Sequence, residues 1–162
     1  MPRKARPTIF LFTDGAAAGN PGPGGYGAIL RCATLEKELS GGFSLTTNNR
    51  MELLAVIEGL EAIRWEGAKV EVWSDSTYVV KAVNEGWLEK WEGKAFKKVK
   101  NPDLWQRFLK VYRTHDVTFH WIKGHAGHPE NERCDALAVA ARSRENLPED
   151  PGYMPQEEEL LM

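Results

Sequence analysis

The sequence predicts an α/β fold in which helices cover a mixed β-sheet. Three strand-like segments come before the first helix, and strands then alternate with helices along the rest of the chain. Strands joined by short turns are expected to pair antiparallel, and strands joined through a helix to pair parallel. The 162 residues contain no internal repeat and no linker, which indicates one domain of ordinary size.

The first three strands are predicted from apolar runs bounded by turn residues. Residues 8–13 (TIFLFT) form a short apolar run that Asp14 and Gly15 end, as is typical of a buried strand. Residues 25–33 (GYGAILRCA) and 37–45 (KELSGGFSL) are predicted as two further strands joined by turns. Together these segments predict an antiparallel meander on one side of the sheet.

The clearest helix is predicted over residues 49–65, where Leu53, Val56, Leu60 and Ile63 recur at helical spacing. The later elements follow from local start and stop signals. They are a strand over residues 70–73, a helix over 76–85 that Gly86 ends, a helix from the N-cap Asn101 and Pro102 to about residue 114, a strand over 117–122 and a helix over 129–144.

Composition and charge exclude several classes of protein. The chain is 42% apolar and 27% charged, which is typical of a globular domain. It has no apolar run of about 18 residues, so no membrane span is expected, and its N-terminus does not resemble a signal peptide. Two cysteines, Cys32 and Cys134, are too few for a disulfide scaffold or a structural zinc site, which favours a reduced, cytoplasmic protein. The net charge of -2 excludes nucleic-acid binding through overall basicity, so such binding requires a local patch.

The two ends of the chain differ from its centre. Residues 1–7 form a basic N-terminal extension, and residues 8–144 form the predicted folded domain. Residues 145–162 form an acidic, proline-containing tail, which we expect to be loosely held or disordered.

Four carboxylates are candidates for the site: Asp14, Glu52, Asp75 and Asp135. Each has a structural explanation when it is considered alone, respectively a turn, a capping box with Asn49, an N-cap and a solvated helix face. These structural explanations are less convincing when the four acids are considered together. Asp14 and Asp75 each follow a strand at the same predicted edge of the sheet, where open α/β sheets bind ligands.

Clustered carboxylates repel one another unless cations lie between them. Oxygen ligands without thiols favour hard ions such as Mg²⁺ or Mn²⁺. Two such ions can clamp the attacking and leaving oxygens of a phosphodiester. The pattern therefore predicts metal-dependent hydrolysis of phosphodiesters.

A histidine in a glycine-rich loop is the candidate acid or base. His125 lies between Gly124 and Gly127, where a side chain can carry a proton to or from a leaving group. The alternative is a surface histidine bonded to a backbone carbonyl. A zinc site of His125, His128 and Cys134 is disfavoured, because the paired-thiol spacing of structural zinc sites is missing. We expect His128 instead to cap or pack at the start of the last helix.

Residues 22–27 (GPGGYG) match the dinucleotide-binding pattern G-x-G-x-x-G. That pattern must open a helix, whereas here a predicted strand follows. We therefore reject a nucleotide cofactor.

A local basic patch is present between residues 90 and 110. Its members are Lys90, Lys94, Lys97, Lys98, Lys100, Arg107 and Lys110, with Trp87, Trp91 and Phe96 interleaved. Basic groups beside aromatic rings favour nucleic-acid binding. The alternative is a solvated helix pair with its aromatic residues in the core, where we expect Trp105.

Several long motifs occur in one order and resemble bacterial type 1 ribonuclease H. They are FTDG (residues 12–15), GNPGPGGYG (19–27), TTNNRMEL (46–53), DS (75–76), DLW (103–105) and KGHAGHPENERCD (123–135). The resemblance implies a five-stranded mixed sheet in order 3-2-1-4-5 with helices on both faces. It also implies that residues 8–144 are a catalytic domain that cleaves the RNA strand of RNA–DNA hybrids, leaving 5′-phosphate and 3′-hydroxyl ends.

The resemblance further implies roles for individual residues. The metal ligands would be Asp14, Glu52, Asp75 and Asp135, which would hold two Mg²⁺ ions, with Mn²⁺ as a substitute. His125 would assist departure of the leaving group, and Glu132 would lie at the rim of the metal site. The substrate-binding residues would be Asn20, Thr47, Asn48, Asn49, Trp87, Trp91, Lys97 and Lys98, with Thr47 in a pocket for a DNA phosphate. The implied partner is a hybrid read with little sequence preference, by a monomer.

The chain departs from the family pattern at three places. The basic protrusion is shorter and carries Glu89 and Glu92, Leu45 stands where arginine is frequent, and Thr77 stands where glutamine or histidine is frequent. Two alternative functions stay open: a catalytically silent hybrid-binding module, and a two-metal nuclease acting on DNA. The four intact acids disfavour the first, and the Asn20 and Thr47–Asn49 motifs disfavour the second.

Overall fold

A five-stranded mixed sheet forms the centre of the computed structural model, which describes residues 6–124 and 127–154. The elements are β1 (Ile9–Ala17), β2 (Gly22–Cys32), β3 (Leu35–Thr46), α1 (Asn48–Glu61), β4 (Lys69–Ser74), α2 (Thr77–Asn84), α3 (Trp87–Gly93), α4 (Pro102–Tyr112), β5 (Asp116–Trp121) and α5 (Pro129–Arg142). The strand order is β3-β2-β1-β4-β5, as expected. Strands β1, β2 and β3 pair antiparallel, whereas β4 pairs parallel with both β1 and β5.

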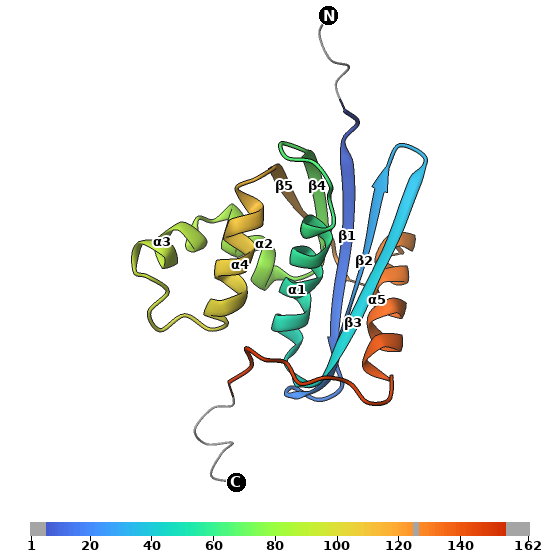
Figure 1. Ribbon diagram of the computed structural model, residues 1–162, viewed down its shortest axis with the longest axis vertical. Coiled ribbons are helices and arrows are strands. Elements are labelled where there is room, and N and C mark those ends of the chain that lie inside the picture. Colours follow the sequence, from blue (N-terminus) through green and yellow to red (C-terminus); the bar gives the residue numbers. More distant parts are fainter. Residues whose placement is uncertain (1–5, 125–126, 155–162) are drawn as a thin grey trace, which may run out of the picture.

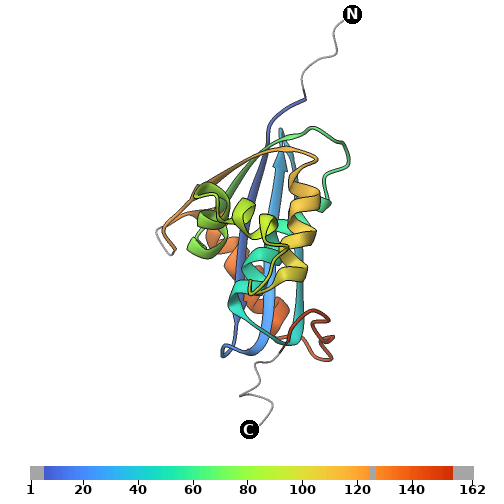
Figure 2. The ribbon, with the colours of Figure 1, turned by 90° about the vertical axis from the view of Figure 1, so that its left-hand side faces the viewer.

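Helices cover both faces of the sheet (Figures 1 and 2), which confirms the predicted layers. α5 packs on β1, β2 and β3, while α1 packs on the opposite face together with α4. The core between α1 and the sheet contains fully buried side chains such as Leu11, Val72, Leu53 and Ile57. Trp105 of α4 is also fully buried, as predicted. No helix in the described part of the chain is long and apolar enough to cross a bilayer.

Glycines allow both covering helices to approach the sheet closely. A Cβ atom on Gly15 of β1 would lie 2.4 Å from the backbone nitrogen of Glu52 in α1. A Cβ atom on Gly27 of β2 would lie 2.4 Å from the carbonyl oxygen of Cys134 in α5. Residues 22–27 lie within β2, so the rejection of a dinucleotide-binding turn is confirmed. Gly27 is required there by helix packing.

The start of α1 differs from the prediction. Thr47 is the N-cap, and its hydroxyl accepts a hydrogen bond from the backbone N–H of Arg50 (3.2 Å). The helix therefore begins at Asn48, and Asn49 does not form the expected capping box. It ends at Glu61, before the predicted end at Trp65, and the turn to β4 contains Gly67 at φ +73°.

Two further elements differ from the prediction. β1 continues through Asp14 to Ala17, because residues 14–17 pair with residues 24–27 of β2 after the pairing with β4 has ended. Residues 87–93 form α3, a helix that the start and stop signals did not predict and that only the alternative of a solvated helix pair allowed. It begins after Gly86 at φ +75° and buries Leu88. This helix lies far from the sheet (Figure 1).

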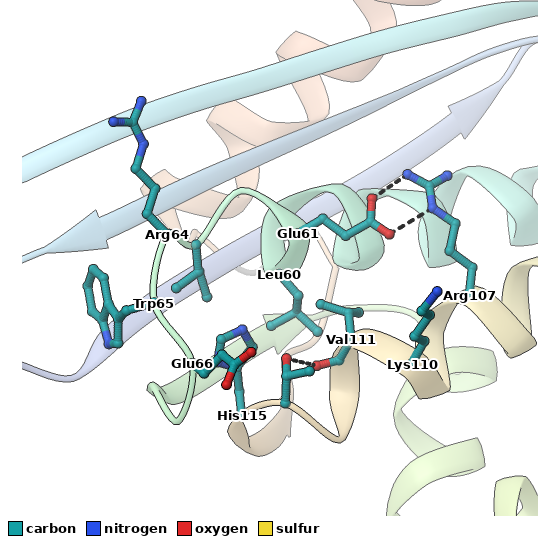
Figure 3. Close-up of a pocket in the computed structure, with 11 residues that line it drawn as sticks. Leu60, Glu61, Arg64, Trp65, Glu66, Arg107, Lys110, Val111 and His115 are labelled. Atoms are coloured by element: carbon teal, nitrogen blue, oxygen red, sulfur yellow. Dashed lines mark hydrogen bonds and ion pairs between the residues drawn. The ribbon is translucent and has the colours of Figure 1, made fainter.

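Ion pairs hold α4 against the C-terminal end of α1. Arg107 of α4 donates to Glu61 (2.8 Å) and to Glu58 (3.0 Å) of α1. A pocket of about 360 Å³ lies beside this contact, between Arg107 and His115 (Figure 3). It shares no residue with the carboxylates described below.

The expectation of a loosely held tail is wrong for the described residues 145–154. This segment runs from the end of α5 back across the end of the sheet towards α1 and α4 (Figure 1). The backbone N–H of Ser44 donates to the carbonyl of Pro148 (2.9 Å), and the hydroxyl of Thr46 donates to Asp150 (2.7 Å). These bonds fix a segment whose composition alone suggested disorder. The boundaries at residues 7 and 144 stay a prediction.

Candidate active site

The site is built where β1 and β4 stop pairing. The parallel pairing of the two strands ends at Phe12 and Trp73. The strands therefore diverge just before Asp14, which lies on β1, and Asp75, which follows β4. Asp14 is 5% exposed, and its Oδ1 accepts a hydrogen bond from the backbone N–H of Gly15 (2.9 Å). β1 has an antiparallel neighbour, β2, on one side and a parallel neighbour, β4, on the other. The opening between β1 and β4 is at the carboxyl ends of these strands, where open α/β sheets bind ligands.

Glu52 reaches the same point from α1. The close approach of α1 at Gly15 brings Glu52 beside Asp14, and Glu52 is only 5% exposed. Carboxylate oxygens of Asp14, Glu52 and Asp75 lie within 4.8 Å of one another. The structure thus brings together three of the four predicted carboxylates.

The structural explanations for these three acids are not supported. Asp14 lies inside β1 and is not a turn residue. Ser76, not Asp75, is the N-cap of α2, and its hydroxyl accepts from the backbone N–H of Val79 (3.2 Å). Glu52 does not cap α1, whose cap is Thr47.

Burial makes the negative charge of this cluster costly. Burial and the neighbouring charge of Asp75 raise the pKa of Asp14 to about 7. Burial raises the pKa of Glu52 well above its usual value, and the charges of Asp14 and Asp75 raise it further. Such a cluster is stabilised in its ionised form by bound cations.

The donor set fits a hard divalent cation. The Oε2 atom of Glu52 is buried and has no hydrogen-bond partner within the described ranges. A buried carboxylate oxygen without a donor is costly unless a cation occupies its free side. The three clustered side chains offer oxygen ligands only, which favours Mg²⁺ or Mn²⁺ over softer metals.

Asp135 approaches the cluster from α5. Its charge contributes to the raised pKa of Asp14, so it lies within electrostatic reach of that carboxylate. The side chain is half-buried and not a fully solvated helix face. It is not among the three residues whose oxygens lie within 4.8 Å of one another.

His125 lies outside the described residues, so its predicted role stays a prediction. The preceding Gly124 lies against Asp75, because a Cβ atom on Gly124 would be 2.8 Å from Asp75 Oδ2. His128 is the N-cap residue of α5, although its side chain forms no capping hydrogen bond. Burial strongly raises the pKa of the Cys134 thiol, which disfavours the thiolate that a zinc site needs.

The asparagines predicted to bind substrate lie around the start of α1. The Oδ1 of Asn20 accepts a hydrogen bond from the backbone N–H of Asn48 (3.1 Å). Asn20, Thr47 and Asn49 line one cleft of about 440 Å³. Residues 99–102 and 152–154 form most of the rest of its lining.

The aromatic residues of the basic arm differ in their environments. Trp87 is 37% exposed and lies 6.4 Å from Trp91, measured between ring centroids. Trp91 packs edge-on against buried Trp105 at 5.3 Å, so it supports the core more than it faces solvent. Lys97 and Lys98 are exposed on the loop that follows α3.

Sequence reasoning missed Trp121 as a neighbour of the site. Trp121 ends β5, is 51% exposed, and its indole N–H donates to the backbone carbonyl of Asp75 (3.1 Å). The only sequence signal was a large aromatic residue at an exposed register of the alternating segment 117–122. The cleft residues Lys100 and Asn101 were recognised only as part of the arm and as a helix cap.

Known proteins resemble this chain over most of its length. The family model described as RNase H matches residues 6–143. Ribonuclease H of Nitratidesulfovibrio vulgaris (strain DP4) is 56% identical over 150 residues, which cover 90% of this chain and 96% of that protein. Ribonuclease H of Syntrophus aciditrophicus (strain SB) is 51% identical over 150 residues, with 90% and 86% covered.

Solved structures agree with these relatives. The crystal structure of LC9-RNase H1, a type 1 RNase H with the type 2 active-site motif, has a TM-score of 0.80 at 29% identity and covers 98% of this chain and 82% of that chain. LC11-RNase H1 in complex with RNA/DNA hybrid has a TM-score of 0.58 at 29% identity, with 83% and 96% covered. By the family match and the identity to its bacterial relatives, this chain belongs to the ribonuclease H family.

Proposed function

We propose that this chain hydrolyses the RNA strand of RNA–DNA hybrids and leaves 5′-phosphate and 3′-hydroxyl ends. The observation that carries the proposal is the buried cluster of Asp14, Glu52 and Asp75 at the point where β1 and β4 separate. The similarity to Ribonuclease H of Nitratidesulfovibrio vulgaris extends over 90% of this chain, which supports the same reaction. A silent binding module is disfavoured, because a buried cluster of negative charge beside phosphates weakens binding.

Asp14, Glu52, Asp75 and Asp135 would hold two Mg²⁺ ions, for which Mn²⁺ can substitute. When bound, such ions activate the attacking water and stabilise the charge of the leaving oxygen. The chain contributes by fixing the carboxylates on three rigid elements, β1, α1 and α5, and on the first residue after β4. The hydrogen bond from the Trp121 indole to the Asp75 carbonyl fixes that residue further.

We propose that His125 assists departure of the leaving group and that Glu132 lies at the rim of the site. The contact of Gly124 with Asp75 supports this assignment, because it brings the residue before His125 to the carboxylate cluster. An imidazole titrates near neutral pH and can therefore give or take a proton during turnover.

Substrate binding is assigned to two surfaces. Asn20, Asn48 and Asn49 would contact the nucleic acid, including the 2′-hydroxyl groups that distinguish RNA from DNA, and Thr47 would line a site for a DNA phosphate. The second surface is the basic arm, where Lys97 and Lys98 would contact phosphates beside exposed Trp87, with Trp91 supporting that ring. The structure of LC11-RNase H1 with a hybrid supports a hybrid as the ligand.

We also propose that the chain acts as a monomer in the cytoplasm. Cys32 and Cys134 are both unpaired, which agrees with a reducing compartment. The mass of the protein in solution, measured by light scattering, tests the monomer.

Metal binding tests the assignment of the site. Isothermal titration calorimetry with MgCl₂ should detect binding to the wild-type chain and a loss of that binding in Asp14→Asn. The same substitution should lower cleavage of a hybrid by at least about a hundredfold, since it removes a ligand that stabilises the reacting charge. Hybrid binding should be retained.

The matched control is Asp116→Asn at the exposed start of β5, which should behave as the wild type. An Asp14→Asn protein that keeps full activity and Mg²⁺ affinity would show that the metal site is wrongly assigned.

A further inference from the structure

One buried arginine holds residues 145–154, here called the C-terminal segment, beside the cleft that Asn20, Thr47 and Asn49 line. Arg50 of α1 is 2% exposed, and all five of its N–H donors are used. It donates to Asp150 through Nε (2.7 Å) and Nη2 (3.0 Å), to Asp103 through Nη1 (2.9 Å) and Nη2 (2.8 Å), and to Asn101 through Nη1 (3.2 Å). One side chain therefore ties α1, the start of α4 and the C-terminal segment together.

Gly152 packs against this network so closely that a side chain there would displace the Asp103 carboxylate or the Arg50 guanidinium. A Cβ atom there would lie 1.7 Å from Asp103 Oδ2 and 2.7 Å from Arg50 Nη2. The backbone N–H of Gly152 also donates to Asp150 (3.3 Å). The backbone at Gly152 therefore packs directly against the ion pairs, and Tyr153 follows at the next position.

Gly152, Tyr153 and Met154 form one wall of the cleft. Tyr153 lines the same cleft as Asn20, Thr47 and Asn49, and Lys100 also belongs to its lining. No carboxylate is among the side chains that line it in the described part of the chain. The neighbouring Asp103 and Asp150 are both paired with Arg50, whose single positive charge balances one of their two negative charges. A cleft with amide, hydroxyl and ammonium donors and no acid suits a phosphate group.

We propose that Tyr153 is a substrate-binding residue, held by the Arg50–Asp150 lock so that it contacts the sugar–phosphate backbone of the hybrid beside Asn20 and Thr47. This inference rests on the proposed function. Tyrosine hydroxyls donate to phosphate oxygens, and the ring covers the sugar. The C-terminal segment is thus part of the binding surface, and Asp150 and Gly152 are positioning residues.

The test compares Tyr153→Ala, Tyr153→Phe and Gly152→Ala with the wild type. Cleavage of a hybrid should show a KM raised about fivefold or more in Tyr153→Ala, with kcat little changed, because the substitution removes an interaction shared by the ground and transition states. Tyr153→Phe should retain part of the affinity through its ring. Gly152→Ala should raise KM similarly although Tyr153 is intact, because the wall is displaced.

The salt dependence of hybrid binding distinguishes the uncharged contact of Tyr153 from the charged contact of a lysine. With the inactive Asp14→Asn background, Tyr153→Ala should weaken hybrid binding by the same factor at every salt concentration, since no charge is removed. Lys100→Ala should instead lower the slope of log K against log salt by about one. Tyr112→Ala controls for lost stability, because Tyr112 stacks on Phe108 at 5.2 Å and does not line the cleft.

Two results are decisive. Folded Tyr153→Ala and Gly152→Ala proteins with wild-type KM and hybrid affinity would overturn the inference while the wild type still cleaves the hybrid. A wild-type chain that neither cleaves nor binds the hybrid would overturn the proposed function itself.

Discussion

Glu52 shows how the site trades stability for chemistry at the scale of single residues. Its carboxylate is buried beside two other acids, and one of its oxygens has no donor within the described chain. In the absence of cations, this arrangement destabilises the folded protein through desolvation and like-charge repulsion. The residues on which the proposed metal site depends therefore lower the stability of the metal-free protein.

The substitution Glu52→Gln should therefore stabilise the metal-free protein while abolishing cleavage. An amide removes one buried negative charge and can donate a hydrogen bond to Asp14. We expect a gain of about 1–2 kcal/mol in the free energy of unfolding in chelator, measured by urea denaturation. A loss of stability in chelator would contradict the account of the cluster.

At the scale of elements, the Arg50 network joins segments that local sequence patterns cannot connect. The side chain of Asp150 is only 5% exposed, and the residue lies 100 positions from Arg50 in the chain. Burial raises the pKa of Asp150, but the hydrogen bonds from Arg50 and Thr46 and the Arg50 charge outweigh it, so the pKa lies below its usual value.

The lowered pKa of Asp150 determines how the stability of the fold depends on pH. Asp150 stabilises the fold above its unfolded pKa of about 4, and this contribution is lost as the pH falls through the lower, folded pKa. Asp150→Asn should cost about 1–3 kcal/mol at pH 7, and the difference from the wild type should shrink towards pH 3. Urea denaturation at both pH values measures this difference in the free energy of unfolding, with the exposed Asp116→Asn as the control. An undiminished difference at pH 3 would exclude the charged pair as its cause.

Sequence patterns predicted most elements, and the misses have physical reasons. The apolar run ending at Asp14 placed the acid correctly, but β1 continues because β2 supplies partners beyond it. The start of α1 depended on which of Thr47 and Asn49 caps the helix, and both types are good caps. Asp75 and Glu52 were found from strand ends and motifs, whereas the contact of Trp121 with Asp75 required the packed structure.

At the scale of the whole molecule, charge is distributed unevenly over a chain of net charge -2. The acidic cluster lies at the centre of the sheet, while exposed Lys97 and Lys98 lie on the loop after α3, away from the sheet (Figure 1). A local basic arm of this kind can attract the phosphate backbone although the chain as a whole is slightly acidic.

Reversing both charges in Lys97→Glu/Lys98→Glu should therefore weaken hybrid binding and flatten its salt dependence. The slope of log K against log salt should fall by about 1–2, according to whether one or both lysines bind a phosphate. Fluorescence anisotropy over a salt series measures this change. An unchanged affinity and slope would remove the arm from the binding surface.

The most direct test of the whole account is cleavage of an RNA–DNA hybrid in which each strand carries its own label. Double-stranded RNA, double-stranded DNA and single-stranded RNA serve as controls, each with Mg²⁺ and with chelator. We predict cuts only in the RNA strand of the hybrid, with 5′-phosphate and 3′-hydroxyl ends, and none in chelator. Hybrid binding without cleavage in either Mg²⁺ or Mn²⁺, or equal cleavage of double-stranded DNA, would contradict the account.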